Sequence, residues 1–352
     1  MINWLPFSFL FTSLMVFGTL FSVSSPHWLS AWIGLEINLI GFLTMLMFRG
    51  LLRETESGVK YLIIQSLGSG LLLTSILIML LSAGNFNIMD TTLFSNTKYM
   101  IMLALFLKLG AAPMHFWLPS TMAGMSWVNC MFLATWQKIA PLILLLTVAN
   151  YEMNLTLLAA SIGAIVGGIG GLNQTHTRAL LAYSSIIHLS WMLASSMFNY
   201  YTTMTYMMVY LLTTTLLFTF LLMNDISQTQ QFSTNMFMDH KQPWMFIMLM
   251  LSLAGMPPLL GFLGKWLVIF DLMMYNYILL LLVLIIGSMM SLFYYLSLSF
   301  AFLLNMQGLS SPHMITAKQT TALKQPSMVT LTMMTLFGFI IILPLMSISN
   351  TT

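Results

Sequence analysis

Long apolar runs constrain the fold of this chain more than any other feature of its sequence. An α-helix needs about 20 mostly apolar residues to cross the hydrocarbon core of a bilayer. Only 5% of the residues are charged, so a soluble fold could not cover its surface with polar groups. The sequence therefore predicts an all-α polytopic membrane protein with about eleven transmembrane helices. The runs lie near 4–22, 27–48, 58–82, 98–119, 125–147, 152–172, 177–197, 203–224, 243–271, 275–304 and 326–346.

The first run has a second interpretation, the apolar core of a secretory signal peptide. Signal peptides begin with a positively charged region, whereas residues 1–6 contain neither Lys nor Arg. The serine-rich stretch from Ser22 to Ser25 could mimic a cleavage site. We expect a retained first helix, with a removed signal peptide as the alternative.

Positive charges lie almost entirely on one side of the predicted helices. Arg and Lys favour the inner side of a membrane, so we expect the N-terminus on that side and, with an odd number of spans, the C-terminus on the other. The connections are too short for a soluble domain, which predicts a single membrane domain over 1–352. The opposite side carries only Lys98, whereas the N-terminal side carries Arg49, Arg53, Lys60, Arg178, Lys241, Lys318 and Lys324.

Prolines interrupt two of the predicted helices, the fourth at Pro113 and the ninth at Pro257 and Pro258. Proline removes a backbone donor, and the freed carbonyls need partners in other helices or a cavity. Interrupted helices five apart predict two inverted five-helix repeats, with two ordinary proline kinks as the alternative. The predicted parts are a first repeat over 1–150, an inverted second repeat over 151–304, and a loop with a C-terminal helix over 305–352.

One carboxylate and three lysines fall inside the apolar spans: Glu36, Lys108, Lys138 and Lys265. At the helical rise of about 1.5 Å per residue, the first three lie about 14, 15 and 20 Å from one end of their spans. Each charge at a helix centre costs about 2.5–3.5 kcal/mol on an insertion scale. We therefore expect these groups to be paired, hydrated or neutral.

A proton relay is the functional interpretation of these four residues. Burial disfavours the charged form of a lysine and a neighbouring carboxylate favours it, so a lysine that changes surroundings can release and recover a proton. The alternative is a static Glu–Lys pair that only fixes helix packing. His188 could join the relay, or it could be an ordinary interhelical donor. No His, Cys or carboxylate cluster has metal-ligand spacing, so no metal site is predicted.

The residues around these lysines resemble a known family. GAAPMHFWLP after Lys108, TWQKIAPL around Lys138, LLAYSSIIH at His188 and GMPPLLGFLGKW ending near Lys265 are similar to subunit 2 of mitochondrial NADH:ubiquinone oxidoreductase, respiratory complex I. The similarity runs from about 32 to 266. It implies an antiporter-like fold and a role in proton translocation across the inner mitochondrial membrane, coupled to electron transfer from NADH to ubiquinone.

The resemblance also implies roles for single residues. Glu36 would modulate Lys108, the switching lysine on the first broken helix. Lys138 would be the central relay and Lys265 the group on the second broken helix. The matched breaks suggest that Lys108 and Lys265 occupy equivalent points of the repeats. The chain departs from the family pattern in three places, none of which removes a buried charge: Ala179, Ser190 and Gly264.

The same resemblance places the redox chemistry elsewhere. FMN, iron–sulfur clusters and ubiquinone would belong to partner subunits, and this chain would hold no cofactor, bind no NADH and bind no nucleic acid. Its partners would be other membrane-arm subunits and lipids, with the N-terminus in the matrix and the C-terminus in the intermembrane space. A stand-alone cation/proton antiporter and a structural or assembly subunit without a conducting path are the competing hypotheses.

Overall fold

The computed structural model describes residues 6–48, 50–83, 88, 95–149, 152–223, 241–257 and 259–307. The predicted C-terminal helix and the loop charges Arg49, Lys318 and Lys324 lie outside these residues. The described chain consists of α-helices and short connections, which confirms the predicted all-α class for this part. The helices are α1 (Pro6–Ser24), α2 (Trp28–Met47), α3 (Leu52–Ala83), α4 (Ser95–Leu109), α5 (Trp117–Gly124), α6 (Trp127–Ala134), α7 (Trp136–Ala149), α8 (Met153–Leu172), α9 (Thr177–Ser195), α10 (Tyr200–Met223), α11 (Lys241–Ala254), α12 (Leu260–Met274) and α13 (Ile278–Gln307).

Several helices match the predicted membrane spans in length and composition. The fourth predicted span falls on α4 and α5, the fifth on α6 and α7, and the ninth on α11 and α12. The break within the fifth span was not predicted. Seven segments of the described chain are long and apolar enough to cross a membrane: Phe7–Ser24, Trp28–Met47, Leu52–Ser82, Trp127–Ala149, Met153–Leu172, Tyr200–Leu222 and Ile278–Phe300.

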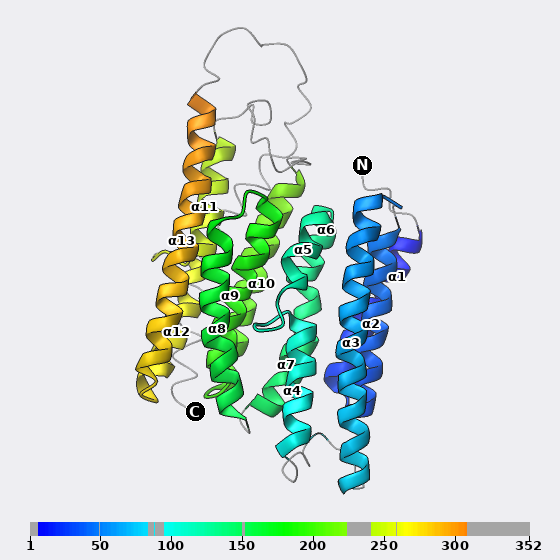
Figure 1. Cartoon of the computed structure of the whole chain (residues 1–352). Helices are drawn as coiled ribbons and strands as arrows, with labels where there is room; N and C mark the ends of the chain where they lie inside the picture. The colour runs from blue at the N-terminus through cyan, green and yellow to red at the C-terminus, as the bar shows by residue number, and fades with distance from the viewer. Residues whose placement is uncertain are drawn as a thin grey trace. The chain divides into compact units, whose positions relative to one another are not determined.

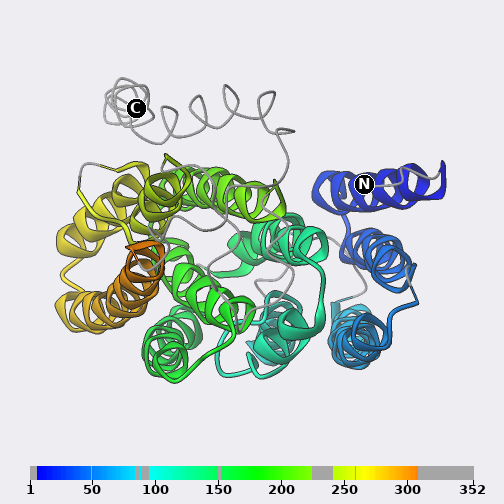
Figure 2. The ribbon, with the colours of Figure 1, turned by 90° about the horizontal axis from the view of Figure 1, so that it is seen from above.

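The chain divides into two compact units. The first unit, Met1–Gly163 with Ser196–Phe198, contains α1 to α7, and the second, Ala164–Ser195 with Asn199–Thr352, contains α9 to α13. In the first unit α1 packs on α2, α3 packs on α2 and α4, and α4 packs on α7 (Figure 1). In the second unit α10 packs on α12, and α13 lies beside α9 and α11 (Figure 2). Each unit therefore has its own set of packed helices.

Glycines bring the backbones of α1 and α2 into contact. A Cβ atom on Gly34 would lie 2.6 Å from the backbone nitrogen of Ser22, and one on Gly18 would lie 2.6 Å from that of Asn38. Small residues allow this close approach between helices in a membrane, where lipid and side chains are equally apolar. The helix that carries Glu36 is thus held directly against α1.

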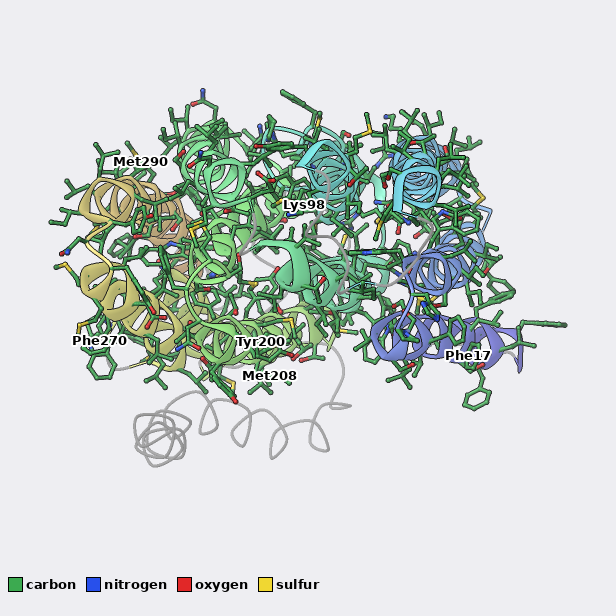
Figure 3. The ribbon with its side chains drawn as sticks, turned by 90° about the horizontal axis from the view of Figure 1, so that it is seen from below. Phe17, Lys98, Tyr200, Met208, Phe270 and Met290 are labelled. Carbon is green, nitrogen blue, oxygen red and sulfur yellow. The ribbon has the colours of Figure 1, made fainter. Side chains whose placement is uncertain are left out.

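Large apolar side chains project from the outer faces of the helices. Phe17 of α1, Met208 of α10 and Phe270 of α12 each expose half or more of their surface and extend away from their own helices (Figure 3). Extensive apolar exposure of this kind is unsuited to water. It fits helices whose outer faces are covered by lipid.

Candidate functional site

The predicted pair of Glu36 and Lys108 meets in the first unit. Glu36 on α2 places its Oε1 atom 3.8 Å from the Nζ atom of Lys108 on α4, whose side chain is only 3% exposed. Charge-assisted hydrogen bonds are about 2.7–2.9 Å long, so this contact is an ion pair without a close hydrogen bond. The Oε1 atom is buried and has no hydrogen-bond partner among the described residues. A small displacement of either side chain would therefore change the electrostatic interaction between the Glu36 carboxylate and the Lys108 ammonium group.

Two buried amides stand beside this pair. Asn38 donates to Oε1 of Gln137 at 2.9 Å, and Gln137 donates back to Oδ1 of Asn38 at 3.0 Å, which joins α2 to α7. The Tyr61 hydroxyl lies 3.5 Å from the same Gln137 oxygen. These groups line a small cavity together with Gln65 and Lys108. The cavity is thus lined by polar side chains from α2, α3 and α7 together with Lys108 of α4.

Lys138 follows Gln137 directly and is also buried, with 4% of its surface exposed. The helix is interrupted just before it, because α6 ends at Ala134 and α7 begins at Trp136. At the junction, both the backbone N–H and the hydroxyl of Thr135 donate to the carbonyl of Met131. Pro141 lacks the N–H that would bond to the Gln137 carbonyl in a regular helix. Lys138 therefore lies on an irregular turn.

The first predicted break follows Lys108. Helix α4 ends at Leu109, and Gly110 has a φ of 69°. The N–H of Gly110 donates to the carbonyl of Leu107, and that of Ala111 donates to Phe106, the two bonds of a Schellman cap. The Trp117 indole donates to the Leu107 carbonyl at 3.1 Å, and Gln65 donates to the Lys108 carbonyl at 3.4 Å. Side chains of α3 and α5 thus supply the partners that a broken membrane helix needs.

The second predicted break has the same backbone cap. Helix α11 ends at Ala254, Gly255 has a φ of 76°, and its N–H donates to the Ser252 carbonyl. The N–H of Met256 donates to Leu251, which completes the second Schellman cap. The chain then passes Pro257 and enters α12 at Leu260; Pro258 lies outside the described residues.

Lys265 on α12 reaches back to this cap. Its Nζ atom donates to the Ala254 carbonyl at 2.6 Å. Its side chain crosses Gly255 so closely that a Cβ atom there would lie 2.9 Å from Nζ. The C-terminal end of a helix carries partial negative charge and free carbonyls, both of which favour an ammonium group. Among the described residues, no carboxylate forms an ion pair with Lys265.

The two lysines do not occupy matching positions relative to their breaks. Lys108 precedes Gly110 on the first half of its helix, whereas Lys265 follows Gly255 on the second half. The expected equivalence therefore applies to the backbone caps and is wrong for the lysines. The reason is that a long lysine side chain can reach a break from either half, so proximity to the break does not fix its position in the chain.

His188 lies in the second unit, on α9. Its Nδ1 atom is 2.9 Å from the hydroxyl of Tyr206 on α10, and its ring centroid is 5.1 Å from that of Tyr210. The side chain is almost fully buried. This contact joins α9 to α10 and is compatible with both roles considered for His188 from the sequence.

The structure brings together some of the predicted residues and adds others. In the first unit Glu36 and Lys108 meet, and Lys138 adjoins their amide neighbours; the second unit holds His188 and Lys265. The sequence analysis missed four polar residues that complete these clusters: Asn38, Tyr61, Gln137 and Tyr206. A signal existed for two of them, since Asn38 and Gln137 are polar residues within two positions of a predicted charge.

Metal-ligating side chains are scattered over the described part of the chain. No cluster of three or more His, Cys, Asp or Glu side chains there could hold a metal ion. Cys130 is buried, and its thiol donates to the Met122 carbonyl at 3.4 Å. This cysteine is therefore part of the packing around α5 and α6.

The chain is similar to known proteins in sequence and in fold. The sequence profile of the NADH:quinone oxidoreductase/Mrp antiporter transmembrane family matches residues 25–291. This chain belongs to that family. It is 39% identical over 304 residues to NADH-ubiquinone oxidoreductase chain 2 of Anopheles gambiae, covering 85% of this chain and 86% of the relative. It is 40% identical over 306 residues to the protein of the same name from Loxodonta africana, covering 84% and 85%.

A solved membrane-protein structure has the same fold. A chain of respiratory complex I from Thermus thermophilus with bound aureothin superimposes with a TM-score of 0.80 at 24% identity, covering 96% of this chain and 79% of that chain. At this level of identity the likeness concerns the fold. The predicted antiporter-like membrane fold is thereby confirmed.

Proposed function

We propose that this chain is the chain 2 subunit of NADH:ubiquinone oxidoreductase and translocates protons within its membrane arm. Family membership and the animal relatives support the assignment to this enzyme. The single observation that carries the proton-translocating role is the ion pair between the buried Lys108 and the part-buried Glu36, 3.8 Å apart in an apolar helix bundle. Intramembrane ionisable groups commonly mark ion or proton pathways.

In this proposal the Glu36 carboxylate controls whether Lys108 is protonated. When the Glu36 carboxylate is close, it stabilises the ammonium form of the lysine. When the carboxylate is protonated or turned away, burial favours the neutral amine, and Lys108 gives up one proton. Lys138 is the next acceptor in the first unit, and His188 and Lys265 continue the relay in the second. Each transfer leaves the donor with one proton fewer and the acceptor with one more.

Two inverted five-helix repeats followed by an eleventh helix form the proposed architecture. The identical Schellman caps at Gly110 and Gly255 support matched breaks in the fourth and ninth spans. Interrupted helices at corresponding positions of inverted halves commonly mark ion sites. The proposed repeats cover 1–150 and 151–304, and the sequence predicts a C-terminal helix in the remaining 305–352, most of which lies outside the described residues.

The proposed location is the inner mitochondrial membrane. The excess of Lys and Arg on the N-terminal side supports a matrix N-terminus and an intermembrane-space C-terminus. The partners are other membrane-arm subunits and lipids. NADH, FMN, iron–sulfur clusters and ubiquinone belong to partner subunits, so this chain contributes proton movement to the enzyme and no redox centre.

Replacing Glu36 by Gln in assembled complex I is the direct test. We expect NADH-driven proton uptake by proteoliposomes to fall about tenfold, because one fixed charge is removed from the switch, an effect of about 1.4 kcal/mol. Lys108→Met should lower it at least as much. The matched control is Glu56→Gln, which removes the carboxylate of the exposed Lys60–Glu56 pair, 2.6 Å long, and should leave pumping unchanged.

The outcome separates the competing functions. Full pumping by assembled Glu36→Gln and Lys108→Met enzymes would contradict the relay and favour a structural subunit. Retention of cation-dependent proton exchange by the isolated chain, without NADH, would favour a stand-alone antiporter. Equal losses from the buried and exposed pairs would indicate impaired assembly.

A further inference from the structure

Tyr206 connects two helices of the second unit that carry predicted relay residues. Its hydroxyl lies 2.9 Å from Nδ1 of His188 on α9. Tyr206 is only 3% exposed and His188 only 7%. Water therefore competes little for this hydrogen bond, and the bond fixes which way the imidazole ring faces.

The aromatic ring of Tyr206 makes a second contact, with α12. A Cβ atom on Gly264 would lie 2.8 Å from Cδ2 and 3.2 Å from Cε2 of the Tyr206 ring. The ring thus occupies the space that any other residue would need at this position. Gly264 immediately precedes Lys265, so the ring touches α12 one residue away from the predicted relay lysine.

Other titratable groups surround the same hydroxyl. Tyr210 lies one turn further along α10, with its ring centroid 5.1 Å from that of His188. Tyr206 also lies within electrostatic range of Tyr210 and of Tyr295 on α13. All three tyrosines are buried, at 3% exposure or less. The titratable groups near Tyr206 are therefore an imidazole and two phenols, and α12, which packs on α10, adds Lys265 and Asp271. Among the described residues, neither Lys265 nor Asp271 forms an ion pair.

We propose that Tyr206 is a positioning residue of the proton path, which orients His188 through its hydroxyl and holds α12 at Gly264 through its ring. The inference rests on the proposed relay through His188 and Lys265. A shift of α12 at Lys265 is transmitted to the Tyr206 ring, and the hydroxyl carries it to the His188 imidazole. Tyr206 couples the two relay residues and remains neutral throughout.

Tyr206→Phe isolates the role of the hydroxyl, because the ring and its packing on Gly264 remain. In assembled, reconstituted complex I we expect NADH-driven proton uptake to fall about two- to tenfold, the range for one net hydrogen bond. The pH profile of uptake should also move, since His188 loses the hydrogen bond with the Tyr206 hydroxyl. Tyr201→Phe on the same helix is the control, because Tyr201 is 68% exposed and its hydroxyl removal should change neither quantity.

Gly264→Ala tests the second contact. The new methyl group would displace the Tyr206 ring, so this variant should lower proton uptake in the wild-type background and add little to Tyr206→Phe. Independent, additive losses would contradict coupling through Tyr206. An unchanged rate and pH profile in assembled Tyr206→Phe enzyme would overturn the inference.

A third variant distinguishes this inference from the proposed function. If Lys265→Ala abolishes proton uptake while Tyr206→Phe has no effect, the positioning role alone is wrong. If Lys265→Ala also pumps at the wild-type rate, the relay fails and the role of Tyr206 fails with it. Should Gly264→Ala not assemble, Tyr206→Phe and its Tyr201→Phe control still decide the question.

Discussion

The two helix breaks share one backbone design and differ in what faces their lysines. Gly110 and Gly255 both end a helix with a Schellman cap. Beside the first cap, Lys108 faces the Glu36 carboxylate at 3.8 Å; at the second, Lys265 donates to the Ala254 carbonyl at 2.6 Å. A carboxylate can gain a proton and lose its charge, whereas a peptide carbonyl keeps its dipole. The first lysine therefore faces a partner whose charge can change, and the second faces a partner whose dipole is fixed.

Gly261→Ala should have the largest effect, and it acts on the second break alone. A Cβ atom there would overlap the carbonyl oxygen of Ser252, a backbone atom that cannot move aside without disrupting α11. We expect little assembled enzyme, measured by native gel electrophoresis. Gly70→Ala is the control, because no heavy atom lies within 4 Å of its Cβ position. Normal assembly of Gly261→Ala would show that the second break is looser than its geometry indicates.

Lys265→Met and the double variant Glu36→Gln with Lys108→Met should separate stability from pumping. Loss of Lys265 removes the donor to the Ala254 carbonyl and should destabilise the second unit by about 1–3 kcal/mol. Replacing both members of a buried ion pair is often neutral or stabilising. Both variants should lose proton uptake, but only Lys265→Met should melt at a lower temperature. Equal melting temperatures would contradict the distinction between the two lysines.

Asn38→Leu and Gln137→Leu probe the pair of buried amides beside the first break, whose side chains hydrogen-bond to each other. Each single change leaves the other amide buried without its partner, which should cost about 1–3 kcal/mol. The double variant should cost less than the sum of the two, with a coupling of about 0.5–3 kcal/mol. Thermal denaturation of the assembled enzyme measures both quantities. Strict additivity would mean that the amide pair contributes no interaction energy of its own.

Lys60→Ala should have the smallest effect. Lys60 lies 2.6 Å from Glu56, closer than Lys108 lies to Glu36. However, both members of the Lys60–Glu56 pair are exposed. Solvent screens an exposed pair, so proton uptake and melting temperature should remain unchanged. A loss comparable to that of Lys108→Met would show that burial is not what distinguishes the two pairs.

The sequence was sufficient to predict the apolar helices of the described chain and the burial of Lys108, Lys138 and Lys265, because both follow from the length of apolar runs. It did not predict that Glu54 and Lys98 are also buried or that Glu36 is only part-buried. It was less accurate about the breaks. Pro113 indicated the first, but α4 ends earlier, at Leu109, since Gly110 is the residue that adopts the left-handed conformation of the cap. The turn before Lys138 was missed, although Pro141 lies one turn beyond it.

The polar partners could not be predicted from the sequence. Asn38 and Gln137 are 99 positions apart, and His188 reaches Tyr206 on another helix. Such contacts depend on how each helix is rotated about its axis. In a soluble helix an apolar stripe reveals this rotation, but in a membrane helix the lipid-facing and core-facing sides are both apolar. The sequence therefore indicates which residues are buried at mid-span and leaves their neighbours undetermined.

The glycine contacts between α1 and α2 determine which side of the Glu36–Lys108 pair can move. Gly18 and Gly34 place the backbones of the two helices against each other. We therefore expect α1 and α2 to move together as one rigid pair. This close approach leaves little room for α2 to slide or turn against α1. The distance between carboxylate and ammonium is therefore adjusted by rotation of their own side-chain bonds or by flexing of α4 at its glycine cap. In either case the backbone of α2 stays in place and Lys108 moves relative to it.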